Sequence, residues 1–524
     1  MRRLLVALLV VTGCHKAKPE AGSPKDADAL WALAPEGTQV GIVATPRGLA
    51  MVEHGWQDVH AFVEKAPDLA AVAKQMDDRL REVTGGSADI KLADYGLTTD
   101  KGGALFVVGP HRVVLVVPVG DRDTFLAKAH GQKGSDVDHI KSATCKPIKN
   151  VYACASDDSL FAALGKGGGL RDKLEARGDI EIVAQGVPGM PMKSAAGALQ
   201  LERGQIVVRG TLAGMPAATT AQLGGPMKAD VDRGHSSGFG VVNLASFLSA
   251  VPDVQIGPSV SASQLAKSFA GPLSMSVPAG QVAFDIKIPL VDTAPSQALI
   301  DHCTDLLPPA LGATSQAGTC HVPLPMVNTA IDAWLDGKTL RIGTKAAPKG
   351  KAIALTPMGA ALAEGSWNFA FWGRGSALAA PALPVPAEAQ QDPEFQLGLR
   401  AMMMLNELGI GVHVEGDMVS VLAVVRTAWS NPDDVVDKLA VFPTADLLAG
   451  KGPAFAQSLG KAPLATDAEA GYAGLLLPIG LVGMASAVGI AAFTEYQVQR
   501  QPLTVPVPPD VPPTPAQPAP PSNP

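Results

Sequence analysis

Aromatic and charged residues are both scarce in this chain. Aromatic residues make up 5% of its 524 residues and charged residues 17%, whereas about 25% charged residues is usual for a soluble protein. The formal net charge is -7 and no cluster of lysine or arginine stands out. A nucleic-acid partner is therefore not expected, because it requires a basic surface. Apolar residues reach 47%, which is enough for a large core, and the length allows two or three domains.

The sequence also lacks most motifs of catalysis and cofactor binding. It contains no GxxxxGK[ST], no HExxH, and no GxGxxG after an apolar strand. Residues 234–238, GHSSG, do match the GxSxG pattern of serine hydrolases, which places the serine between a strand and a helix. Here Ser236 follows a polar loop and precedes the strand-like FGVVNL, so the context is reversed. A hydrolase using Ser236 is the weaker alternative, and we expect no enzyme, no catalytic residues, no cofactor and no metal.

The chain contains only five cysteines, and the first of them ends an export signal. The opening MRRLLVALLVVTGC has two arginines, a short apolar run over residues 4–11, and small residues before Cys14. It resembles the lipobox of bacterial lipoproteins, which implies a signal peptide over residues 1–13 and acyl chains on Cys14. An ordinary signal peptide with an incidental cysteine is the alternative. The polar residues 14–29 then form a flexible tether.

The other four cysteines fall into two local pairs, Cys145 with Cys154 and Cys303 with Cys320. An even number of cysteines in an exported chain favours disulfides, and these two bonds are the simplest of three possible pairings. His302 and His321 flank the second pair, so a zinc site is an alternative. It is weaker, because no CxxC is present.

The body of the chain alternates strand-like and helix-like segments in an order that occurs twice. We expect an α+β fold of two related modules, residues 30–225 and 226–465, each with a mostly antiparallel sheet and flanking helices. Hairpins close both modules, at residues 198–212 and 409–427, and an apolar helix is expected over residues 396–408. A loose alignment of two unrelated α+β stretches is the alternative.

The first module opens with Leu33-Ala34-Pro35-Glu36-Gly37-Thr38, followed by an apolar strand. It resembles uncharacterised families of bacterial envelope lipoproteins, whose domains begin with Leu-Pro-x-x-Thr, although this chain has one extra residue before the proline. The resemblance implies a location and a fold, and it adds no chemistry.

The end of the chain predicts a membrane anchor and an extended tail. Residues 470–494 are uncharged, and the 23 residues 471–493 would span roughly 34 Å as a helix, enough to cross a bilayer. Proline then recurs every third residue in the tail, residues 495–524, as in a polyproline II rod. Such a tail either docks on a protein partner or is only a spacer. Its repeating prolines include Pro506, Pro509, Pro512, Pro515, Pro518 and Pro521.

Taken together, these features predict an exported lipoprotein that acts as a non-catalytic binding or structural component of the bacterial envelope. Its expected partners are membrane lipid, reached through Cys14 and the 471–493 helix, and proteins of the envelope. We expect the inner membrane, with the body in the periplasm, and an outer-membrane lipoprotein is the alternative. A second hypothesis is a carrier that holds an apolar ligand, such as a lipid, between the sheet and the helices.

Overall fold

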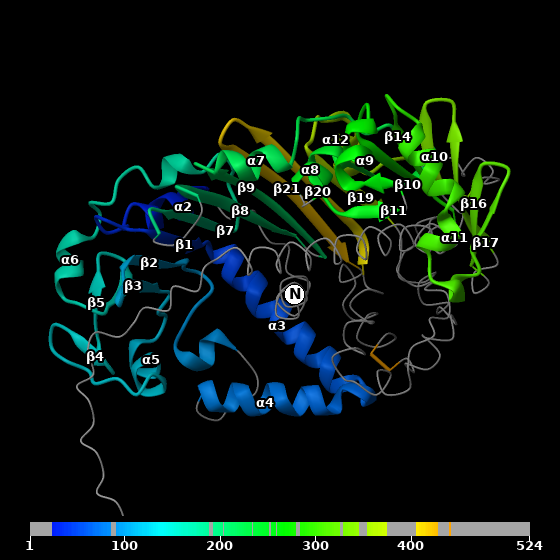
Figure 1. Ribbon diagram of the computed structural model, residues 1–524. Coiled ribbons are helices and arrows are strands. Elements are labelled where there is room, and N and C mark those ends of the chain that lie inside the picture. The colour runs from blue at the N-terminus through cyan, green and yellow to red at the C-terminus, as the bar shows by residue number, and fades with distance from the viewer. Residues whose placement is uncertain are drawn as a thin grey trace, which may run out of the picture. The chain divides into compact units, whose positions relative to one another are not determined.

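The computed structural model describes most of the body of the chain (Figure 1). The described residues are 24–84, 91–187, 192–202, 204–232, 234–250, 253–257, 259–278, 283–324, 329–344, 354–374, 405–427 and 440–441.

A 19-stranded sheet dominates these residues, and every pairing in it is antiparallel. The first nine strands are β1 (Val40–Ala44), β2 (Gly103–Gly109), β3 (Arg112–Val117), β4 (Asp138–Ile140), β5 (Ala143–Ile148), β6 (Val151–Ala155), β7 (Ile180–Gln185), β8 (Ser194–Glu202) and β9 (Gln205–Ala213). Their spatial order is β4-β5-β6-β3-β2-β1-β7-β8-β9.

The other ten strands continue the same sheet. They are β10 (Ser236–Val242), β13 (Leu273–Pro278), β14 (Asp285–Pro289), β15 (Thr314–Gln316), β16 (Thr319–Leu324), β17 (Thr329–Asp336), β18 (Thr339–Gly343), β19 (Phe369–Arg374), β20 (Leu405–Glu415) and β21 (Met418–Thr427). Their spatial order is β21-β20-β19-β10-β13-β14-β18-β17-β16-β15. A separate ribbon pairs β11 (Gln255–Gly257) with β12 (Val260–Ser261).

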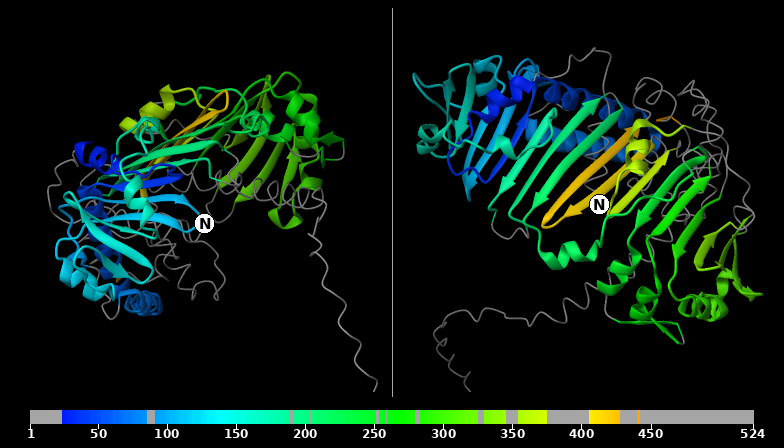
Figure 2. Two further views of the ribbon diagram at one scale, coloured as in Figure 1. Left: turned by 90° about the vertical axis from the view of Figure 1, so that its left-hand side faces the viewer. Right: turned by 90° about the horizontal axis from the view of Figure 1, so that it is seen from above.

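The two runs of strands meet at β9 and β21, which pair from Gln205 opposite Arg426 to Leu212 opposite Val419. In Figure 2 the orange strands β20 and β21 lie beside the teal strands β8 and β9. Read outward from this junction, the first run is β9-β8-β7-β1-β2-β3-β6-β5-β4. The second run repeats this order as β21-β20-β19-β10-β13-β14-β18-β17-β16 and adds β15 at its far end.

The expected fold class, two α+β modules with separate sheets and a C-terminal transmembrane helix, is wrong. The strands of both expected modules form one sheet, because the hairpin strands β9 and β21 each have an edge of backbone N–H and C=O groups that pairs with the other. Within the part of the chain that the structure describes, no helix is both long and apolar enough to span a membrane. The predicted span, residues 470–494, lies outside the described residues. The module boundaries stay a prediction.

The helices lie between strands and are short, apart from two. They are α2 (Pro24–Trp31), α3 (Pro46–Lys65), α4 (Ala70–Thr84), α5 (Arg122–Lys128), α6 (Ser159–Ala163), α7 (Ala217–Gln222), α8 (Leu244–Ala250), α9 (Ala262–Ser268), α10 (Ala294–Asp301), α11 (Cys303–Leu306) and α12 (Pro357–Glu364). The described residues also form 3-10 turns at Pro67–Leu69, Leu92–Tyr95, Arg171–Lys173 and Pro309–Leu311.

Helices α3 and α12 begin with the same N-terminal capping motif. Thr45 accepts a hydrogen bond from the Gly48 amide at 3.1 Å, and Thr356 accepts one from the Gly359 amide at 3.0 Å. A proline follows each threonine in the first turn, where its missing N–H costs nothing. The Thr-Pro-x-Gly pattern therefore fixes both helix starts locally.

The expected helix over residues 396–408 is wrong at its C-terminal end. Residues 405–408 belong to β20, and residues 396–404 lie outside the described part of the chain. Backbone pairing with β19 and β21 draws these residues into the sheet, so tertiary pairing overrides a helical apolar pattern.

Helices α2 and α3 lie on opposite faces of the sheet. Trp31 of α2 packs with Val43 and Phe106, whereas Met51 of α3 packs with Leu199 and Leu201. Successive side chains of a strand point to opposite faces of the sheet. Val43 pairs with Glu181, and the next residue, Ala44, pairs with Ile180. The side chains that contact Trp31 and those that contact Met51 therefore lie on opposite faces. The α2 side of the first run is the better buried one.

A glycine in β1 is required by the packing of α2. A Cβ atom placed on Gly41 would lie 2.4 Å from the Trp31 ring, far inside van der Waals contact. We predict that Gly41→Val lowers the free energy of unfolding by about 3 kcal/mol, because the ring must leave its site. Urea unfolding followed by circular dichroism measures this change.

The matched control is Gly109→Val at the end of β2, where no described residue comes within 4 Å of the added Cβ. Equal losses in the two variants would show that the Trp31 contact is not the cause.

Candidate functional site

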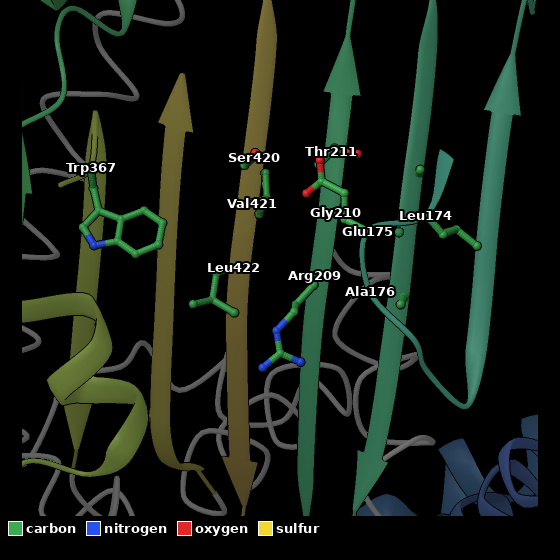
Figure 3. A pocket seen from close by; sticks show the side chains of 13 residues that line it. Leu174, Glu175, Ala176, Arg209, Gly210, Thr211, Trp367, Ser420, Val421 and Leu422 are labelled. Carbon is green, nitrogen blue, oxygen red and sulfur yellow. The ribbon is translucent and has the colours of Figure 1, made fainter. Parts of the chain in front are cut away.

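The centre of the sheet, where the two runs of strands meet, has a groove on the α2 side (Figure 3). Side chains of β8, β9 and β21 form its floor, and all of them except the arginine are small or medium in size: Ala196, Ala198, Arg209, Thr211, Ser420 and Leu422. Trp367 stands at one side and residues 174–176 at the other, and the groove has a volume of about 300 Å³. A volume of this size is at the lower end of small-molecule sites.

The groove contains one acidic and one basic side chain, Glu175 and Arg209, both exposed. Arg209 donates from Nη1 to the Gln200 side-chain oxygen at 2.7 Å. The Trp367 ring is fixed by a 2.9 Å hydrogen bond from Nε1 to the Leu362 carbonyl. The described part of the groove therefore offers a flat, largely apolar floor with a single cation.

The other side of the same strands is apolar throughout, and we call it the apolar face. It is made of residues that face the α3 side and are at least partly exposed: Val40, Ile42, Leu105, Val107, Val113, Leu115, Ile180, Ile182, Ala195, Leu199, Val208, Leu212, Val421, Ala423, Val425, Leu408, Ile410, Val412 and Val414. Leu115 is 44% exposed.

The register shows why these side chains share one face. Ile42 pairs with Leu105 on one side and Ile182 on the other, and the same row continues across β8, β9, β21 and β20 to Val412. All of these side chains, from β3 to β20, are aliphatic, and beyond β20 the rows continue into Phe369 and Phe371 of β19, which pair with Val412 and Ile410. An uninterrupted apolar surface that keeps contact with solvent marks an interaction site.

Helix α3 covers only part of the apolar face. Met51 packs against Leu201 and Ile206, which are buried, and against the partly exposed Leu199. Further along the sheet, Gly197 pairs with Gly210. Of the described residues, only backbone atoms of the neighbouring strand come within 4 Å of a Cβ placed on either glycine. This pair therefore adds no side chain to the middle of the face.

A buried carboxylate near the first disulfide has a structural role. Asp138 accepts hydrogen bonds from Arg122 Nη2 at 2.6 Å, from the Gly134 amide at 3.0 Å and from the Tyr152 hydroxyl. Burial alone would raise the pKa of Asp138, but Arg122, Tyr152 and Gly134 stabilise its charged form and lower the pKa to about 2. The same burial and the neighbouring carboxylate raise the pKa of Tyr152.

Asp179 ties α3 to the sheet. Its carboxylate accepts a hydrogen bond from the Leu201 amide at 2.7 Å and lies 3.4 Å from Arg47 Nη1, and its carbonyl accepts one from the Thr45 hydroxyl at 3.2 Å. Burial raises the pKa of this carboxyl, although Leu201 and Arg47 favour its charged form. The group positions the start of α3 beside the apolar face.

The structure joins Cys145 to Cys154 and Cys303 to Cys320, in agreement with the simplest pairing. His302 lies 3.2 Å from Asp305 and His321 lies 2.8 Å from Asp332. Among the described residues, no group of three or more His, Cys, Asp or Glu is placed to hold a metal.

Ser236 is the first residue of β10 and is buried. The strand follows the serine, which is the reverse of the strand-then-helix order that a nucleophile elbow needs. His235 contacts Asp232, three residues earlier, at 3.1 Å. Cys14 and the prolines from Pro506 to Pro521 lie outside the described residues.

Sequence reasoning missed both the groove and the apolar face. The strands that form them do carry a signal, since residues 206–208 and 419–425 are apolar almost without interruption, a pattern of strands with two covered faces. The pairing of β9 with β21, which places these residues side by side, has no local signal.

We predict that Asp138→Asn lowers the free energy of unfolding by about 2 kcal/mol at neutral pH, because Arg122 loses its buried partner. Since the pKa of Asp138 lies below the value of about 3.9 expected for the unfolded chain, its stabilisation is present above pH 4 and is lost as the pH falls toward 2. Urea unfolding at pH 7 and pH 3 tests this prediction. The difference in free energy of unfolding between the wild type and the variant should be smaller at pH 3.

Asp123→Asn, at an exposed neighbouring carboxylate, is the control and should change the stability little. If Asp138→Asn lowered the free energy of unfolding equally at both pH values, the stabilising role of the charged Asp138 carboxylate would be contradicted.

No protein-family model matches this chain, and no curated protein matches it. The chain is similar to solved structures of a protein named TP0453. Crystal form I is 11% identical, covers 45% of this chain and 94% of its own, and has a TM-score of 0.21. Crystal form III is 9% identical, covers 45% and 95%, and has a TM-score of 0.22. Crystal form IV is 8% identical, covers 34% and 81%, and has a TM-score of 0.21. Similarity at this level establishes neither family nor function.

Proposed function

We propose that this protein is a lipid-tethered, non-catalytic binding component of the bacterial envelope, and that its apolar face holds the acyl chains of a lipid. The observation that carries the proposal is the apolar face itself. Its side chains are aliphatic in every row from β3 to β20, and most keep contact with solvent.

The composition of the apolar face favours acyl chains over a protein partner. Protein interfaces concentrate their binding energy in Trp, Tyr and Arg and carry about one hydrogen bond per 100–200 Å². The face has none of these side chains, and its backbone groups already pair within the sheet. An acyl chain needs no hydrogen bond and gains about 0.8 kcal/mol for each methylene that it buries.

The position of α3 beside the apolar face suits an elongated ligand. Met51 packs over Leu201 and Ile206 at one end of strands β8 and β9, and the Gly197–Gly210 pair has no side chains at their middle. An acyl chain lying across the strands at this glycine pair would contact Ile182 and Val421 in the same row. The helix forms one wall, and the sheet forms the floor.

The proposed tether is the lipidated Cys14, followed by the polar residues 14–29. It would keep the body close to a membrane, where acyl chains are available. The chemistry of the site needs no nucleophile, metal or cofactor, because the ligand is held and not transformed.

We predict that Leu212→Glu reduces the affinity for a fluorescent fatty acid at least about tenfold, because a carboxylate on the apolar face must lose its water when the chain binds. The measurement is fluorescence titration of the purified protein with the labelled fatty acid. Leu212 is partly exposed, so the substitution leaves the core intact.

The matched control is Ala213→Glu, one residue further along β9 and therefore on the opposite side of the sheet. It adds the same charge and should leave the affinity within about twofold of wild type. Equal losses in both variants, or no binding to the wild type, would contradict the proposal.

We predict that Cys14→Ser abolishes the incorporation of radiolabelled palmitate and releases the protein from the membrane fraction of the cells that express it. A lipid anchor supplies the tether in this proposal, and without it the polar residues 14–29 have too little apolar surface to bind a bilayer. Retention of the variant in membranes at the wild-type level would show that another part of the chain is the anchor.

A further inference from the structure

Arg209 differs from most of the arginines that the structure describes. Arg122 pairs with Asp138, Arg341 with Asp285 and Arg426 with Glu407, all within 4.0 Å. In the described part of the chain, Arg209 has no such carboxylate, and its hydrogen-bond partner is the neutral side chain of Gln200. Its guanidinium has five N–H donors, and one of them donates to Gln200. The other donors can form hydrogen bonds with a ligand.

The position of Arg209 makes its unused N–H donors available to a ligand in the groove. It lies in the floor of the groove, opposite Leu422 of β21 in the register. The next pair along the same side is Thr211 opposite Ser420, and in Figure 3 the guanidinium extends away from this pair, toward the Leu422 side of the groove. Figure 3 shows these side chains on one side of the sheet, with Trp367 at the edge.

The charges in the groove limit the kind of anion. The Glu175 side chain lies over the floor near Thr211, so a second negative group must share the groove with it. A singly charged carboxylate suffers less repulsion there than a phosphate with nearly two charges. A carboxylate also matches the planar fork of the guanidinium with two parallel hydrogen bonds.

We propose that the groove binds a small organic monoanion, a carboxylate on an apolar body, and that Arg209 is the residue that binds its headgroup. The apolar body lies on Ala198 and Leu422 and against the ring of Trp367. This site is on the opposite side of the sheet from the apolar face and is independent of the lipid proposal.

Isothermal titration calorimetry of the full chain tests the proposal with two probes of the same shape, 4-phenylbutyrate and the neutral 4-phenylbutan-1-ol. We expect Arg209→Met to weaken the binding of phenylbutyrate by about tenfold or more, the usual cost of losing a charged hydrogen bond. Binding of the alcohol should change by less than about threefold, since it has no charge to lose. Glu175→Gln should strengthen the binding of phenylbutyrate and leave that of the alcohol unchanged.

Arg112→Met is the matched control, because Arg112 is an exposed arginine on β3 and its removal changes the net charge equally. It should leave both affinities at the wild-type level, and circular dichroism checks that each variant is folded. Three results would overturn the proposal: no binding of phenylbutyrate to the wild type, equal weakening of both probes by Arg209→Met, or an effect of Arg112→Met as large as that of Arg209→Met. Leu212→Glu, on the apolar face, should not alter phenylbutyrate binding, so failure of this site and failure of the lipid proposal are distinguishable.

Discussion

The backbone pairing of β9 with β21 is the interaction on which the rest of the structure depends. Each strand ends a hairpin and would otherwise leave a row of N–H and C=O groups without partners, which is costly for a long apolar strand. Pairing along eight residues, from Gln205 to Leu212, satisfies both edges at once. It also turns two runs of strands into one sheet and creates a broad central surface that neither run has alone.

The two sides of this central surface have different chemistry because the side chains of a strand alternate. Leu212, Val421 and Val412 face one side with other aliphatic residues, whereas Arg209, Thr211 and Ser420 face the other. One side therefore suits acyl chains, and the other suits a small acid with an apolar body. The flanking elements add the walls: α3 stands on the aliphatic side, and Trp367 and residues 174–176 stand on the side of the groove.

Local features of the fold were predictable where one short stretch decides the structure. The hairpins at residues 198–212 and 409–427 correspond to β8–β9 and β20–β21, because alternation and a glycine-containing turn act over a few residues. Both cysteine pairs are close in sequence, and both form disulfides. Helix α3 continues through Gly55, because this glycine is buried and packing outweighs the low helix propensity of a single glycine.

The sequence by itself determined the positions of the hairpins, the helix starts at Thr45 and Thr356, and the pairing of nearby cysteines. All of these rest on contacts within about 20 residues. Only the tertiary structure decided that the two runs of strands share one sheet, and that Trp367 and Leu174 enclose a groove with Arg209 in its floor. Residues 205–212 and 419–426 are far apart in the chain, and each strand edge could pair with many others. The choice is made by the fit of whole apolar surfaces, which no local pattern encodes.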